Sequence, residues 1–442
     1  MTAHPLTRTG TDEGDVLHGE DMDDREFIPF RRPCSPLSLS MVASAIQDLL
    51  EEEERRGVRT RKRRAVDQKT FEATVAAVLC DVAFLELTEA SAWASVTFDK
   101  SVLGCGGRYR AEALSTKFPE VVRALADRQW IELEVGYHKH PFIYGRPSRR
   151  TRIRAGDLVR RSWIGAGLRM EDFELDDSEE VIILRRQRID HRDRGGSVDY
   201  ADTETTNRYR AELRRINEWL RAAPLNFLGT PSDRPVDLGD RRLRRIFNGS
   251  FERGGRLYGG FWQKLKSDER LSRLTISGAP VVELDYGQMS LRLLYGAAKV
   301  QPAWSDGYAV PGLEGHREGT KKLLNAMLNR ESPLTKYPKG LRSMFPAVTP
   351  AWEAVRLIEE FHPPLRDQWR PKVGLELMFR ESCILIDVLL LLADMNITAL
   401  PIHDAVLVSQ KHADITKGVM LEVFHRHTSI QGQVGMNSRR EP

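Results

Sequence analysis

The chain has 442 residues and is 41% hydrophobic, which is enough for two or three domains with apolar cores. Its formal net charge of +4 is too small to indicate a nucleic-acid partner by itself. The chain has four cysteines, Cys34, Cys80, Cys105 and Cys383, and no two of them have the spacing of zinc ligands. This argues against a zinc site and against a disulfide scaffold, and it fits a protein of the reducing cytosol. The apolar run 383–393 is too short to cross a bilayer, and we find no signal-peptide pattern. We therefore expect a soluble cytoplasmic protein with no membrane partner.

The N-terminal part is predicted to contain a tail and a small nucleic-acid-binding domain. Residues 1–35 are acidic and lack apolar periodicity, so we expect a disordered tail. Three segments have the apolar spacing of helices: 37–54, 71–87 and 115–128. Alternating strands over 130–137 and 151–155 then flank an arginine-rich loop. A helix followed by such a hairpin is typical of a winged helix, which we expect over 36–180, with an ordinary small α/β domain as the alternative.

Basic residues gather at 55–64, 146–161 and 241–245. Three such clusters suit a groove that follows phosphates, although each alone also fits a solvated surface. Residues 181–240 are expected to be a linker and a thumb-like helix. Val181–Leu184 fits a short strand, and residues 207–222 form a charged helix with an apolar stripe.

Two later stretches each deliver an acid to the end of a strand. Val281, Val282 and Leu284 fit a buried strand that ends at Asp285, and a helix follows from Gly287. Residues 397–408 fit two short strands joined by His403 and Asp404. Two acids on neighbouring strand ends could hold two divalent ions about 3.5–4 Å apart, the arrangement used in phosphoryl transfer. Mg²⁺ needs few protein carboxylates because phosphates and water supply its other ligands.

Cationic side chains lie before and between these acids. On a helix over 315–330, Arg317, Lys321 and Asn325 share one face. That face could hold a triphosphate, and Lys321 could protonate the leaving pyrophosphate, with Lys322 as the alternative in register. Upstream, residues 241–263 combine arginines, aromatics and glycines, which suits close approach to a nucleic-acid strand.

The order of these motifs resembles family A DNA polymerases over about residues 240–425. DYGQMSLR, residues 285–292, is similar to their first palm motif, DYSQIELR, and IHDAVLV, residues 402–408, is similar to the third, VHDE followed by apolar residues. Arg317-Glu-Gly-Thr-Lys321 matches the R-x-x-x-K opening of the fingers helix. Gly255-Arg256-Leu257 followed by Trp262-Gln263 resembles the TGRLSS…LQ segment at the primer–template minor groove.

The resemblance implies a palm of antiparallel sheet and helices and small fingers over 241–442. Together with the winged-helix-like α/β region expected from the N-terminal patterns, this predicts an α+β multidomain protein. The resemblance also implies that Asp285, Asp404 and the Tyr286 carbonyl hold two Mg²⁺ ions, for which Mn²⁺ can substitute. Arg317 and Lys321 would act on the triphosphate. The remaining residues would contact nucleotide or nucleic acid: Arg256, Gln263, Gln288, Ser290, Asn325 and His403.

Several positions depart from the family pattern. Ser290 replaces the glutamate that closes off space for a ribose 2′-hydroxyl, so we predict weakened exclusion of ribonucleotides. Asn325 and Asn329 replace aromatics of the fingers helix, and Ala405 replaces an acid. Glu381 and Ser382 lie near the place of a Gln-Gly pair beside the primer strand.

We therefore expect a template-directed nucleotidyltransferase without a proofreading nuclease, acting in replication of a plasmid, phage or mobile element. Its partners would be a DNA template and primer, or RNA, with dNTPs and also NTPs as substrates. A DNA polymerase is the leading expectation, and a primase–polymerase is one form of it. A single-subunit DNA-dependent RNA polymerase and a catalytically inactive replication or DNA-binding protein remain as alternatives.

Overall fold

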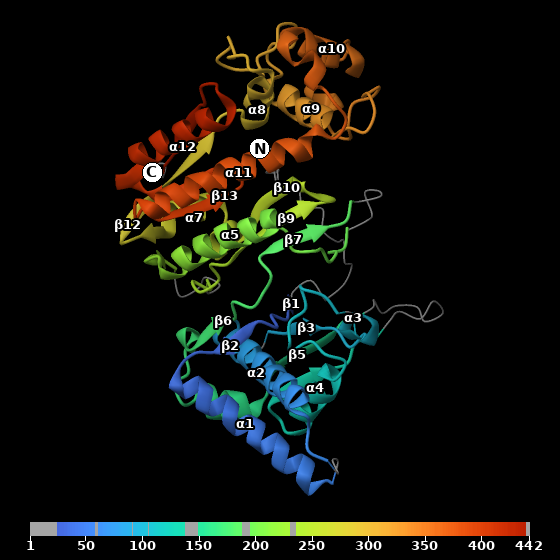
Figure 1. Ribbon diagram of the computed structural model, residues 1–442, viewed down its shortest axis with the longest axis vertical. Helices are drawn as coiled ribbons and strands as arrows, with labels where there is room; N and C mark the ends of the chain where they lie inside the picture. The colour runs from blue at the N-terminus through green and yellow to red at the C-terminus, as the bar shows by residue number, and fades with distance from the viewer. Residues whose placement is uncertain are drawn as a thin grey trace, which may run out of the picture. The chain divides into compact units, whose positions relative to one another are not determined.

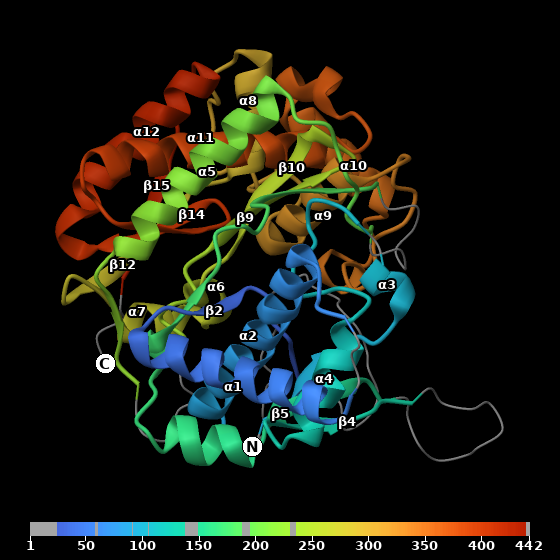
Figure 2. The ribbon, with the colours of Figure 1, turned by 60° about the horizontal axis from the view of Figure 1, so that its bottom comes forward.

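The computed structural model describes residues 24–57, 61–90, 92–104, 106–137, 149–187, 195–229 and 236–438. The chain divides into two compact units, Met1–Glu179 and Glu180–Pro442 (Figures 1 and 2). Each unit has its own core of buried apolar residues, as separately folding domains do. Both combine helices with mainly antiparallel sheets, so the predicted α+β multidomain class is confirmed. Among the helices that the structure describes, none has both the length and the apolar content to cross a bilayer.

The first unit packs helices against a four-stranded sheet with the order β1-β3-β5-β4. Its elements are β1 (Arg25–Glu26), β2 (Arg31–Pro33), α1 (Pro36–Arg55), α2 (Ala65–Thr88), β3 (Ala94–Val96), α3 (Lys100–Gly104), α4 (Phe118–Asp127), β4 (Ile131–Glu134), β5 (Thr151–Ala155) and β6 (Phe173–Leu175). Helix α2 is its centre, because the run from Thr74 to Leu85 is buried on every side.

The start of the first unit corrects one prediction. Strand β1 pairs with β3, and β2 pairs with β6. The fully buried carboxylate of Asp81 on α2 forms ion pairs with Arg25 at 2.7 Å and with Arg31 at 3.3 Å. A buried carboxylate requires such partners, so this pairing fixes the segment on the core. The expected disordered tail over 1–35 is therefore wrong for residues 24–35, and residues 1–23 lie outside the described residues.

The predicted basic hairpin has its arginines balanced by acids. In the β4–β5 register Glu132 faces Arg154 and Glu134 faces Arg152, so opposite charges lie side by side. Each arginine described between 149 and 161 pairs with at least one carboxylate: Arg149, Arg150, Arg152, Arg154, Arg160 and Arg161. This face of the hairpin therefore offers little free positive charge. The rest of the expected wing, residues 138–148, lies outside the described residues.

The second unit contains two sheets. Its elements are β7 (Ile182–Arg185), α5 (Glu204–Ala222), β8 (Leu225–Phe227), β9 (Leu243–Asn248), β10 (Ser250–Gly259), α6 (Phe261–Lys264), α7 (Ser267–Arg273), β11 (Leu274–Ile276), β12 (Ala279–Tyr286), α8 (Met289–Ala298), α9 (Arg317–Asn329), α10 (Ala351–Phe361), α11 (Val373–Asp394), β13 (Ala399–Ile402), β14 (Ala405–Ser409), α12 (Ala413–Thr428) and β15 (Val434–Asn437). The larger sheet has the order β13-β14-β12-β11-β8, and β15 pairs with β12. The smaller has the order β10-β9-β7.

Helix α11 lies at the middle of this unit. It contacts α12 and α8, the strands β10 and β13, and the helices α5 and α9 (Figure 1). Most of its residues from Glu381 to Leu392 are buried, because neighbours cover it on several sides. The helix therefore connects β13, which leads into Asp404, with the helix that carries Lys321.

The segment expected as a linker and thumb-like helix is built into the second unit. Strand β7 runs parallel to β9, and β8 pairs with β11. Helix α5 begins at the cap Thr203, buries the predicted apolar stripe and packs on α11. In their described part, residues 181–240 therefore belong to this unit's sheets and core, and the linker interpretation is wrong there, because β7 and β8 pair with its strands and the apolar stripe of α5 is buried in its core. Residues 188–194 and 230–235 lie outside the described residues.

Candidate active site

The two predicted acids lie at the same end of two neighbouring strands. Asp285 is the penultimate residue of β12 and is paired in register with Ala405 at the start of β14. Asp404 immediately precedes Ala405 in the tight β13–β14 turn, where His403 has the left-handed φ of 54°. The backbone N–H of Tyr286 donates to the carbonyl of Asp404 at 3.4 Å. The predicted strand, turn and hairpin thus bring both acids together.

The pKa of Asp285 also reflects the nearby charge of Asp404. Burial, together with the negative charges of Asp404 and Glu283, raises the pKa of Asp285 to about 7. The ammonium group of Lys321 opposes this rise, so α9 directs that cation toward the acids. Glu283, two residues earlier on the same face of β12, is paired with Arg270 at 3.4 Å. An excess of negative charge at Asp285 and Asp404 therefore remains for a cation to neutralise.

A third carboxylate, from α11, lies beside this pair. Glu381 accepts two hydrogen bonds from Arg256 of β10, at 2.7 Å from Nε and 3.1 Å from Nη2. Burial raises the pKa of Glu381 to about 7, and the guanidinium of Arg256 opposes the rise. Asp404 also acts on both members of the pair. Glu381 is thus near the acids, but both its oxygens are engaged by Arg256.

On α9, Lys321 and Asn325 are exposed, whereas Arg317 already has partners. The guanidinium of Arg317 pairs with Asp306 at 2.5 Å and lies 5.3 Å from the ring centre of Tyr308. Burial raises the pKa of Tyr308 to about 12, and Asp404 and Arg317 both act on its hydroxyl. Tyr308 therefore contacts Arg317 of α9 and is near enough to Asp404 to feel its charge. The sequence pattern does not indicate Asp306 and Tyr308, because an irregular loop has no periodicity that marks its side chains.

Several residues that are predicted to contact nucleotide or nucleic acid make hydrogen bonds within the protein. The side chain of Gln263 donates to the carbonyls of Leu257 and Pro401 and accepts from the N–H of Gly259. It therefore ties β10 to the end of β13, close to His403.

Gln288 and Tyr286 also have structural contacts. Gln288 caps α8 and bonds Ser305 and Gly307, which fixes the loop before Tyr308. The hydroxyl of Tyr286 donates to the carbonyl of Met420 at 2.7 Å, so only its backbone lies toward the acids. Ser290 is half-buried in the first turn of α8, and His403 is exposed beside the ring of Tyr258.

The glycines near Arg256 approach protein atoms, which corrects the interpretation that they serve approach to nucleic acid. Gly255 has a φ of 79°, and a Cβ there would lie 3.0 Å from both the Phe247 ring and the Ser382 hydroxyl. At Gly259 a Cβ would lie 2.2 Å from the carbonyl of Arg242. These positions require glycine because β10 is bulged and packs closely on β9 and α11. The arginine-rich start of β9 is similarly internal, since Arg245 is buried against Ser382 and Cys383.

The residues present fit a hard divalent ion. Asp285 and Asp404 offer carboxylate oxygens, and the backbone of Tyr286 lies beside them. Within the described residues no three His, Cys, Asp or Glu side chains converge as metal ligands. Any ion here would therefore rely on two carboxylates, backbone oxygen, water and substrate phosphate, which suits Mg²⁺ more than a metal that needs a full protein ligand set.

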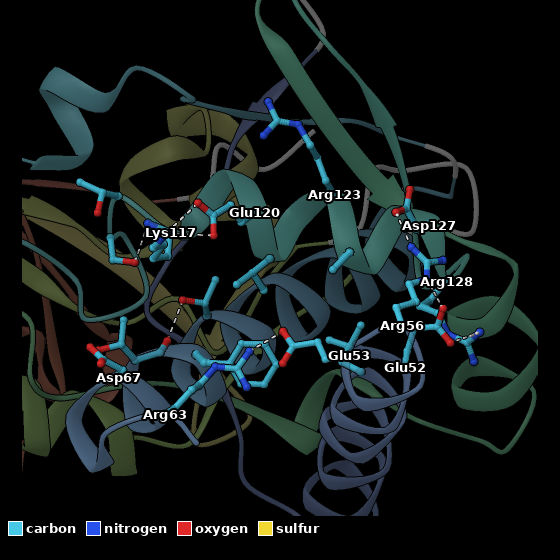
Figure 3. A pocket seen from close by; sticks show the side chains of 18 residues that line it. Glu52, Glu53, Arg56, Arg63, Asp67, Lys117, Glu120, Arg123, Asp127 and Arg128 are labelled. Carbon is cyan, nitrogen blue, oxygen red and sulfur yellow. Dashed lines mark hydrogen bonds and ion pairs between the residues drawn. The ribbon is translucent and has the colours of Figure 1, made fainter. Parts of the chain in front are cut away.

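The first unit has a separate hollow of about 610 Å³ between α1, α2 and α4 (Figure 3). Its lining combines apolar residues with five acidic and five basic side chains. Arg63 pairs with Glu53 at 2.5 Å and lies over the ring of Phe71, and Lys117 pairs with Glu120 at 2.9 Å. Because these charges largely neutralise each other, the hollow favours neither anions nor cations, and we assign it no ligand.

No known protein family and no curated protein matches the sequence. Among solved structures, the chain is similar to the POL domain of Pol1 from M. smegmatis, solved in complex with DNA primer-template and dNTP. The similarity covers 53% of this chain and 51% of that chain, with 13% sequence identity and a TM-score of 0.30. This chain thus spans about half the length of that one.

Proposed function

We propose that the second unit is a template-directed nucleotidyltransferase related to family A DNA polymerases. The observation that carries the proposal is that Asp285 and Asp404 lie at paired strand ends and that both Asp404 and Lys321 of α9 are near enough to act on the pKa of Asp285. A pair of acids at strand ends beside a lysine on a facing helix is the arrangement needed to bind phosphates through divalent ions. The sequence resemblance at 285–292, 317–321 and 402–408 supports the same assignment.

The proposed reaction joins a 3′-hydroxyl to the α-phosphate of a nucleoside triphosphate and releases pyrophosphate. When bound, two Mg²⁺ ions held by Asp285, Asp404 and the Tyr286 carbonyl supply Lewis-acid activation and neutralise phosphate charge, and Mn²⁺ can substitute. The 3′-hydroxyl loses its proton to solvent water, and the new bond forms between the 3′-oxygen and the α-phosphorus as the bond from the α-phosphorus to the α–β bridging oxygen breaks. Lys321 gives a proton to the leaving pyrophosphate, and Arg317 binds the triphosphate once it leaves Asp306.

The nucleic-acid strand would lie along β10 and the His403 turn. Arg256 is partly exposed and held in place by Glu381, so its guanidinium can meet the strand end in a fixed orientation. Gln263, which sequence alone assigns to the minor groove, supports this region through its bonds to Leu257 and Pro401. Ser290 leaves space near the nucleotide sugar, which supports use of ribonucleotides and keeps an RNA polymerase as the second candidate.

The test is a nucleotide-incorporation assay with the full chain and a single-stranded DNA template in Mg²⁺ or Mn²⁺. Reactions are run with and without a primer, and with dNTPs or NTPs. We expect primer-dependent product with both sugars, and none from Asp285→Ala. NTP-only synthesis without a primer would favour the RNA polymerase. Template binding with no product under any condition would contradict the proposed activity and favour an inactive replication protein.

A further inference from the structure

The strongest unexplained surface of the second unit surrounds Trp352, at the start of α10. All eight tryptophans lie within the described residues, and Trp352 is the exposed one, with 60% of its surface accessible. Val348, four residues earlier, is 88% exposed. A large aromatic side chain left in water beside another apolar one indicates a contact surface, because burial of both against a partner is favourable.

The chain leading to Trp352 is basic and contains no acid. Residues 332–352 carry Lys336, Lys339 and Arg342 but neither aspartate nor glutamate. Both lysines are exposed, and in the described part of the chain neither forms an ion pair. A hollow of about 550 Å³ at this surface is lined by residues that include Lys336, Val348 and Ala351. This surface therefore attracts a partner with negative charge and flat apolar groups.

Contacts within the segment give this surface a defined shape. The rings of Tyr337 and Phe345 stack with centres 4.8 Å apart. The guanidinium of Arg342 lies 5.4 Å from the Tyr337 ring centre and donates to the carbonyls of Pro346, Ala347 and Thr349. Arg342 is thereby used inside the loop, which leaves the two lysines as its free cations.

This surface is also joined to the helix that carries Lys321. On α9, Gly319 lies against Met344 and Phe345, where an added Cβ would be 2.8 Å from the Met344 carbonyl. His316, just before α9, contacts the same carbonyl at 2.8 Å and stacks on Phe345. Whatever binds beside Trp352 is therefore held in a fixed relation to α9.

We propose that Trp352, Val348, Lys336 and Lys339 form a binding surface for single-stranded nucleic acid, on which a base stacks against Trp352 and the lysines contact phosphates. A single strand is favoured over a duplex because only unpaired bases present a free face for stacking. It is favoured over an acidic protein because a planar aromatic paired with separate cations matches a base and its backbone. That the strand is the template of the reaction rests on the proposed function.

The test measures binding of a labelled single-stranded oligonucleotide to the full chain carrying Asp285→Asn, so that no synthesis is needed. Trp352→Ala should weaken binding about ten-fold, within the range for loss of one stacked base, and Trp352→Phe should keep most of it. The double change Lys336→Ala with Lys339→Ala should lower the salt dependence, by a slope of about 1.4 for two phosphate contacts on a single strand. Binding of the oligonucleotide should quench the tryptophan fluorescence of the parent, and most of this quenching should be absent in Trp352→Phe.

Matched controls are Met395→Ala and Lys417→Ala, another exposed apolar residue and another exposed lysine of the same unit. Both should bind like the parent. The proposal is overturned if Trp352→Ala binds the oligonucleotide as tightly as the controls do. It is also overturned if the folded chain binds no single strand, which would leave a protein partner for this surface. Trp352-dependent binding without any nucleotide incorporation would uphold this inference and count only against the proposed function.

Discussion

In the ion pair between Arg256 and Glu381, the two side chains differ in their exposure to water, and this difference decides how much stability is lost when Arg256 is removed. The side chain of Glu381 is 4% exposed, whereas that of Arg256 is 28% exposed. Water can therefore reach the arginine but not the carboxylate. Burial alone would lower the pKa of Arg256, but the charge of Glu381 outweighs this and leaves the pKa raised. The pair stabilises the fold mainly by keeping a buried carboxylate from being alone.

We predict that Arg256→Ala lowers the free energy of unfolding by about 3 kcal/mol at pH 8, because the buried Glu381 loses the guanidinium that stabilises its charged form. Because the pKa of Glu381 is raised above its usual value, the folded state binds the proton more tightly than the unfolded state. Stability therefore decreases as the pH rises toward about 7, and the loss in Arg256→Ala should shrink at pH 6.

Urea unfolding at both pH values provides the measurement. Adding Glu381→Gln to Arg256→Ala should restore most of the lost stability, because a neutral amide costs less to bury than a carboxylate. A double variant as unstable as Arg256→Ala alone would show that the missing arginine, and not the unpaired acid, causes the loss.

At the scale of elements, His362 joins three segments around the candidate site. It is completely buried at the end of α10 and contacts the carbonyl of Gly307 at 3.0 Å through Nε2 and the hydroxyl of Tyr295 on α8 at 3.1 Å through Nδ1. A carbonyl only accepts hydrogen bonds, so Nε2 carries the proton and Nδ1 accepts from Tyr295. The neutral ring thereby fixes the loop that presents Tyr308.

Burial lowers the pKa of His362 to about 4, against about 6.5 in the unfolded chain. Between pH 6.5 and pH 4 the unfolded state binds more protons than the folded state does. The contribution of His362 to the free energy of unfolding therefore decreases as the pH falls through this window. The full difference, 6.5 minus 4, corresponds to about 3 kcal/mol. We expect His362→Gln to be less stable than the parent at pH 7.5 but to lose less stability on acidification to pH 4.5. Equal losses in urea unfolding at the two pH values would contradict this role.

At the scale of the whole molecule, local patterns predicted elements well and long-range partners poorly. Strand β12, the β13–β14 hairpin and α9 follow from alternation and helical spacing within short segments, so the meeting of Asp285 with Asp404 was predictable. Glu381 and Arg256 are 125 positions apart, and no local pattern connects them.

The β4–β5 hairpin was predicted correctly as a pair of strands, but the ion pairs that order residues 24–35 and neutralise the hairpin arginines were not. Composition alone does not reveal that Asp81 recruits Arg25 and Arg31 into the core. It also does not reveal that each basic residue of β5 lies opposite an acid of β4. Charge in a sequence indicates an external partner only where the fold leaves that charge unpaired, as it does at Lys336 and Lys339.

The central claim is that Asp285 and Asp404 together support nucleotidyl transfer. The most direct measurement is the rate of a single nucleotide addition to a primer in Mg²⁺, for the parent, Asp285→Asn and Asp404→Asn. Lys321→Ala is added as a third variant, and Asp268→Asn, an exposed acid on α7, is the matched control. We predict no detectable addition by either acid variant, a loss of about 100-fold or more for Lys321→Ala, and parent activity for Asp268→Asn. Addition at the parent rate by Asp285→Asn or by Asp404→Asn, with the fold intact, would contradict the account.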